Sequence, residues 1–180
     1  PMGQGLLELR ERVRDGAEPG RIGVWGHVAR RQLGDDDATS WSIGGHFYLP
    51  VTRNAALLGE ITHGRDLAAI GGGLGHGLDP VTRRGVHGTG GWFEATANPT
   101  RKLLVAEGFA IDTVRRADVA VGERVSNLVA YLVLRLRPRD TVELGAEGNF
   151  WLTTFKTADP GDEPVTGRAL RLDLHAAVLF

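Results

Sequence analysis

The strict alternation of apolar and polar residues in the last eleven positions constrains the fold more than any other feature of the chain. The polar phase begins with Arg171, Asp173 and His175. The apolar phase holds Leu170, Leu172, Leu174, Ala176, Val178 and Phe180. Successive side chains of a β-strand point to opposite faces, whereas a helix would mix these charged residues with the leucines. Residues 170–180 therefore predict a strand with one apolar face and one polar face.

The same alternation recurs upstream and predicts an all-β chain. Seven further strands are expected at residues 21–31, 40–51, 55–63, 91–97, 102–112, 127–137 and 142–152. Residues 6–14 fit either a helix or a strand, and we interpret them as a ninth strand. Glu107 conflicts with the pattern, because it falls in the apolar phase of its segment.

The lengths of the strands and connections favour a membrane barrel. An eleven-residue strand spans about 36 Å, and a tilt of about 40° leaves a rise of about 28 Å, close to the apolar band of a transmembrane β-barrel. Strands of soluble proteins usually have about five or six residues. The joins at 52–54, 98–101 and 138–140 are tight, whereas those at 65–85, 114–125 and 155–167 are long. Short turns on one edge and long loops on the other are typical of such barrels.

Composition excludes several classes of function. The net charge is −1, from 21 basic and 22 acidic residues, which gives no basic surface for a nucleic-acid partner. Cysteine is absent, so disulfides, thiolate metal ligands and cysteine nucleophiles are excluded. No apolar run approaches the roughly 20 residues that a membrane-spanning helix needs.

The sequence gives no pattern for catalysis, a metal or a cofactor. The six histidines lack the spacing of a metal site on one element. Ser42 and His46 share a strand face, but four residues at about 3.3 Å each separate them by about 13 Å. We therefore expect no enzyme. The glycine run at 71–77 lacks the spacing of a phosphate-binding loop.

The final strand, R-L-D-L-H-A-A-V-L-F, resembles the C-terminal strand of Gram-negative outer-membrane proteins. The stretches Gly90 to Thr100, Leu132 to Asp140 and Leu57 to Leu67 resemble the closing hairpins of porin-like channel proteins. This resemblance implies an antiparallel up-and-down transmembrane β-barrel in the outer membrane, inserted by the barrel-assembly machinery. The resemblance to porins also implies that residues 64–85 fold into the lumen and narrow it. Residues 1–180 would be one barrel domain, the C-terminal part of a longer barrel whose signal peptide and first strands precede Pro1.

The phases of the strands divide the candidate residues between two surfaces. We predict that the pore is lined by Glu94, Tyr131, Arg135, Arg137, Glu143, Glu147, Arg171, Asp173 and His175. The residues predicted to face lipid are Leu132, Leu134, Leu144, Phe150, Leu172, Leu174 and Phe180. Trp25, Trp92 and Trp151 also point inward, either as a path for sugars or aromatic solutes or as space-filling groups.

These assignments predict a channel for passive diffusion of small hydrophilic solutes. Its partners would be outer-membrane lipid, the permeating solutes and the assembly machinery, and formation of a homo-oligomer is left open. Two alternatives remain at this point. One is a soluble or periplasmic all-β binding module whose apolar face packs on a second sheet, and the other is a structural barrel with a plugged lumen.

Overall fold

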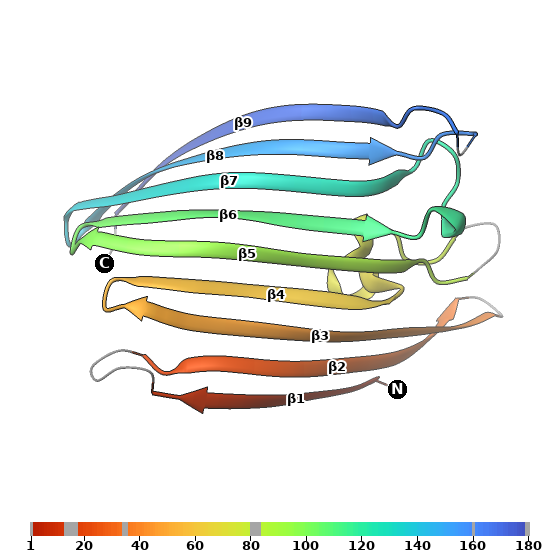
Figure 1. Ribbon diagram of the computed structural model, residues 1–180, viewed down its shortest axis with the longest axis horizontal. Coiled ribbons are helices and arrows are strands. Elements are labelled where there is room, and N and C mark those ends of the chain that lie inside the picture. The colour runs from red at the N-terminus through yellow and green to blue at the C-terminus, as the bar shows by residue number, and fades with distance from the viewer. Residues whose placement is uncertain (1, 13–17, 34–35, 80–83, 160, 179–180) are drawn as a thin grey trace.

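The computed structural model describes residues 2–12, 18–33, 36–79, 84–159 and 161–178. Every strand pairs antiparallel with its neighbours in sequence, which gives one sheet in the order β1 to β9 (Figure 1). The strands are β1 (Met2–Glu11), β2 (Gly20–Leu33), β3 (Asp36–Thr52), β4 (Ala55–Arg65), β5 (His87–Thr100), β6 (Leu103–Val114), β7 (Arg124–Arg139), β8 (Val142–Phe155) and β9 (Val165–Val178). The predicted all-β, up-and-down architecture is confirmed, with all nine expected strands. The described sheet is open, with β1 and β9 at its edges.

Three short 3-10 helices lie in the long connections. They are η1 (Leu67–Ile70), η2 (Gly73–Gly75) and η3 (Arg116–Asp118). Within the described residues, no helix has the length and apolar content that a membrane-spanning helix requires. Figure 1 shows the tight turns after β3, β5 and β7 at one end of the strands. The long connections after β4, β6 and β8 lie at the opposite end, which we call the loop end.

One face of the sheet is apolar and exposed. Leu172 and Leu174 on β9 are 70% and 74% exposed, and Leu132 on β7 is 46% exposed. Other large apolar side chains that remain exposed are Ile22, Val24, Phe47, Ile61, Phe109, Leu134, Leu144 and Phe150. No second layer covers this face in the part of the chain that the structure describes, and soluble monomers rarely expose apolar surface on this scale.

Cross-strand register explains how this apolar face is built. Phe47 of β3, Phe93 of β5 and Phe109 of β6 lie in one row. Their ring centroids are 6.3 Å apart for the first pair and 5.9 Å for the second. Gly59 lies between Phe47 and Phe93 in this row, and a Cβ there would be 2.8 Å from the Phe47 ring. Aromatic contacts of this kind stabilise neighbouring strands and fix their register.

The small buried core lies at the loop end of the strands and not between two sheets. It comprises Leu74, Val86, Val114, Val119 and Val125, which come from the long connections and the adjoining strand ends. Hydrophobic burial therefore holds the loops onto the sheet, while the strands themselves are held by backbone hydrogen bonds and cross-strand contacts.

Glu107 is a charged residue within the apolar face. It pairs with Ala95 on β5 and Leu132 on β7, and it is exposed. Phe109 and Val105 flank it on the same face of β6. The conflict in the sequence pattern is therefore present in the fold.

We predict that replacing Glu107 with Leu stabilises the protein in a bilayer. A carboxylate facing lipid near the middle of the apolar band destabilises a barrel, so its removal should raise the free energy of unfolding by about 1–2 kcal/mol. Denaturant titration of the vesicle-inserted protein measures this change. Glu147→Leu, on the polar face, should give no increase, and an unchanged or lower stability of Glu107→Leu would show that the carboxylate does not face lipid.

Candidate functional site

The polar face carries a cluster of ion pairs near the tight turns. Arg137 of β7 donates to Glu143 of β8 at 2.8 Å. His175 of β9 lies 3.5 Å from the same carboxylate. Three neighbouring strands thus bring together three of the residues that the sequence predicts to line the pore. Arg135 lies on the same face, in register with Gly145 and, beyond it, His175.

The other predicted pore residues lie on this face in three smaller groups. Arg171 and Asp173 of β9 form an ion pair of 2.8 Å. Glu147 accepts a hydrogen bond of 2.9 Å from Asn149. The Tyr131 hydroxyl of β7 donates to Glu94 of β5 at 2.8 Å. This last contact passes over β6 at Gly108, where a Cβ would lie 2.6 Å from the Tyr131 hydroxyl oxygen.

The residues predicted to face lipid occupy the opposite face. Register places Leu132 with Leu172, Leu134 with Leu174 and Leu144 with Leu136, in rows on the exposed apolar surface. Phe150 is paired with Leu170 on the same surface. Phe180 lies outside the described residues. The structure thus separates the two predicted sets by face, and their contacts with water and lipid stay predictions.

The described part of the connection between β4 and β5, residues 66–79 and 84–86, folds back against the polar face. The backbone N–H of Leu74 donates to Oδ2 of Asp112 on β6 at 2.8 Å. Arg124 of β7 donates to the carbonyl oxygen of Leu74 at 2.9 Å. His76 lies 3.0 Å from the carbonyl oxygen of Arg124. Two later strands therefore hold this segment, which we call the inner loop.

Apolar burial reinforces the inner loop. Leu67 is 2% exposed and Leu74 is 8% exposed, so both are buried. Leu67 fits against Gly88 of β5, where an added Cβ would lie 3.2 Å from the Leu67 Cδ1 and 3.4 Å from the Gly73 Cα. A larger residue at position 88 would push the inner loop away from the wall, because close approach requires the missing side chain.

The connection between β6 and β7 is tied to the start of β5. The backbone N–H of His87 donates to Asp118 at 3.1 Å, and the His87 ring lies 2.8 Å from the same oxygen. Burial raises the pKa of the Asp118 carboxyl, but the contacts with His87 and the charge of Arg115 outweigh that effect and lower the pKa below its usual value. This attachment therefore depends on an ionised Asp118.

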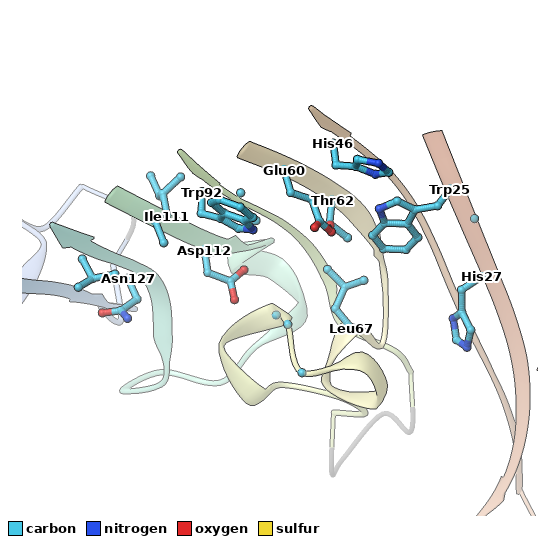
Figure 2. A pocket seen from close by; sticks show the side chains of 18 of the residues that line it. Trp25, His27, His46, Glu60, Thr62, Leu67, Trp92, Ile111, Asp112 and Asn127 are labelled. Atoms are coloured by element: carbon cyan, nitrogen blue, oxygen red, sulfur yellow. The ribbon is translucent and has the colours of Figure 1, made fainter. Parts of the chain in front are cut away.

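A cavity of about 1100 Å³ lies between the inner loop and the polar face. Leu67 and Gly71–Gly73 line it from the loop, and Trp25, Glu60, Trp92, Asp112 and Trp151 line it from the strands. Figure 2 shows Trp25, Glu60, Thr62 and Trp92 along the wall, with Leu67 opposite them. The Trp25 indole lies over Gly44, because a Cβ there would be 2.5 Å from the ring.

Sequence reasoning placed the three tryptophans inward but did not select Glu60 or Asp112. Both residues share the polar phase of their strands, so the alternation could have identified them. Their roles depend on contacts with residues distant in sequence, such as the 38-position separation of Leu74 and Asp112. Among the described residues, no group of three or more potential ligands is placed to hold a metal ion.

We predict that Asp112→Ala loosens the inner loop. Loss of a hydrogen bond to a charged group removes about 1.5–3 kcal/mol, so hydrogen exchange at the Leu74 amide should accelerate by about tenfold or more. Exchange mass spectrometry of a peptide covering residues 67–78 measures this rate. Asp173→Ala, on the same face in β9, should leave the rate unchanged, and equal protection in both variants would contradict the anchoring role.

No protein-family model matches this chain. The comparison with curated proteins also gives no match. Among solved structures, the chain is similar to the crystal structure of the outer membrane channel DcaP of Acinetobacter baumannii, with a TM-score of 0.69 and 12% sequence identity. The similarity covers 98% of this chain and 54% of that chain, so this chain spans about half the length of the structure it matches. The comparison therefore shows that this antiparallel sheet has the fold of an outer-membrane channel.

Proposed function

We propose that the protein is a porin-like channel of the outer membrane through which small hydrophilic solutes diffuse passively. One observation carries this proposal: a single-layered sheet has an uncovered apolar face and, opposite it, a charged face with a cavity. In a membrane barrel, lipid covers the apolar face and water fills the polar side. The fold shared with an outer-membrane channel supports the same assignment.

The soluble alternative is disfavoured by the same surface. A binding module in water would need a second layer over the leucines of β7 and β9, and none is found within the described residues. The plugged-barrel alternative differs from the proposed channel only in that it would not conduct ions. Planar-bilayer recording of the full-length protein separates the two, because a plugged barrel would give no discrete current steps.

We propose further that the inner loop limits the width of the pore. It projects from the wall to form one side of the cavity, and four of its residues line that space: Leu67, Gly71, Gly72 and Gly73. Hydrogen bonds to Asp112 and Arg124 hold it in this position.

Deleting residues 67–78 from the full-length protein should therefore raise the single-channel conductance. The deletion removes both 3-10 helices of the loop and widens the path for ions. Deleting residues 157–162 from the connection between β8 and β9 is the matched control, since none of the described residues of this segment lines the cavity. Equal conductance in both deletion variants would contradict the narrowing role.

The ion pairs near the tight turns are proposed to orient solutes during passage. Arg135, Arg137 and Arg171 share the polar face with Glu94, Glu143, Glu147 and Asp173, and two of the arginines form ion pairs there. Fixed charges of both signs along a water-filled wall create a transverse field. Because the two signs nearly balance, this part of the pore should show weak selectivity between anions and cations.

Reversing both arginines, Arg135→Glu and Arg137→Glu, should shift the reversal potential toward cations. The double change replaces two positive charges with two negative ones on the polar face. Reversal potentials in a salt gradient measure the selectivity. Arg168→Glu makes a like change on the opposite face and should have no effect, whereas the absence of a shift in the double variant would remove both arginines from the pore wall.

A further inference from the structure

We propose that the cavity selects organic cations, binding an ammonium group between the Glu60 carboxylate and the indole rings of Trp92 and Trp25. This inference rests on the proposed channel and names the class of solute that the channel favours. The solute would be an alkyl or quaternary ammonium compound with an apolar body. Three observations support the inference. They are the charge of the cavity lining, the ion-pair and hydrogen-bond partners of its charged residues, and the position of the indole rings beside Glu60.

The formal charge of the described cavity lining is negative. Glu60 and Asp112 are its charged members, and none of the described lining residues is a lysine or arginine. Arg124 contacts the inner loop, but its guanidinium donates to the carbonyl oxygen of Leu74 and does not line the cavity. A cleft lined by one sign of charge raises the local concentration of oppositely charged solutes. The cavity therefore favours cations even though the whole chain is nearly neutral.

Several arginines of the polar face have other partners, and Arg135 lies at the tight-turn end of β7, in register with Gly145. Arg10 pairs with Glu8, Arg137 with Glu143 and Arg171 with Asp173. Arg21 lies over the Tyr48 ring, 4.9 Å from its centroid. Arg10, Arg21 and Arg137 thus lie toward the tight turns and Arg171 is paired midway along β9, while no described lysine or arginine lines the cavity.

Glu60 is a half-buried carboxylate without an ion-pair partner among the described residues. The hydroxyl of Thr62 donates to it at 3.4 Å, a long contact. Its neighbour in register on β3 is His46, which already lies 2.8 Å from Glu8. A partly desolvated carboxylate gains from a cationic partner, because removal from water is unfavourable unless the charge is compensated.

Indole rings lie on both sides of this carboxylate. Trp92 on β5 is the direct register partner of Glu60, and it is 37% exposed. Trp25 on β2 lies over Gly44 of β3, whose register partner on β4 is Thr62. Figure 2 shows both indoles beside Glu60 and Thr62 on the wall that faces the inner loop. A cation within about 6 Å of an indole face is attracted by the ring quadrupole.

These features favour a cation over a neutral sugar. Sugars also stack on indoles, but they carry no charge that would compensate Glu60. The volume of about 1100 Å³ leaves room for an apolar body beside the ammonium group. Leu67 and the glycines of the inner loop provide an apolar surface for it.

The test measures binding of benzyltrimethylammonium to the full-length protein in detergent by titration calorimetry, with glucose and benzoate as neutral and anionic probes. We expect the cation to bind more tightly than both. Glu60→Gln and Trp92→Leu should each weaken it by about fivefold or more. Glu107→Gln and Trp41→Leu, on the opposite face, are matched controls and should leave the affinity unchanged.

The outcomes separate this inference from the proposed function. Tighter binding of glucose or benzoate, or equal affinity in Glu60→Gln and Glu107→Gln, would overturn the cation site even if the protein conducts ions in a bilayer. Loss of affinity confined to Glu60→Gln and Trp92→Leu supports the site. Bilayer recording of the same preparation tests the channel independently, because absence of current would contradict the channel without changing the calorimetric result.

Discussion

Backbone hydrogen bonding between neighbouring strands is the constraint on which the rest of this structure depends. Hydrocarbon offers no partner for an N–H or C=O group, so a chain that crosses lipid with strands must satisfy these groups within the sheet. The continuous register from β1 to β9 does so for the seven inner strands. Period-two alternation then assigns each side chain to one face of the sheet or the other, since a shift of one residue would exchange the two faces.

The polar face is divided along the strand direction into two regions of different chemistry. Near the tight turns, arginines and carboxylates compensate one another in close pairs such as Arg137 with Glu143. Midway along β4 and at the loop end of β6, Glu60 and Asp112 line the cavity without a described lysine or arginine among the lining residues. In the proposed channel, a permeating solute would meet a negative aromatic region and a region of balanced charge in succession.

Alternation was sufficient to predict eight of the nine strands and the polar face that carries Trp25, Trp92 and Trp151, because each depends on local periodicity. Residues 6–14 fitted a helix as well as a strand, so β1 did not follow from alternation alone. Alternation also identified Glu107 as a conflict, which the structure places on the apolar face. The roles of Glu60 and Asp112 could not be read in this way. The alternation predicts the face of the sheet on which a side chain lies. Its neighbours on that face depend on the register between strands that are far apart in sequence.

The attachment of the inner loop also has a consequence for the order of assembly. Leu74 is held by Asp112 and Arg124, which follow it by 38 and 50 positions and belong to strands that come after the loop. The hairpin of β3 and β4 can therefore form while the loop is still unattached. Only when β6 and β7 have joined the growing sheet does the segment gain its fixed place. Attachment of the inner loop is thus a late event in the assembly of this sheet.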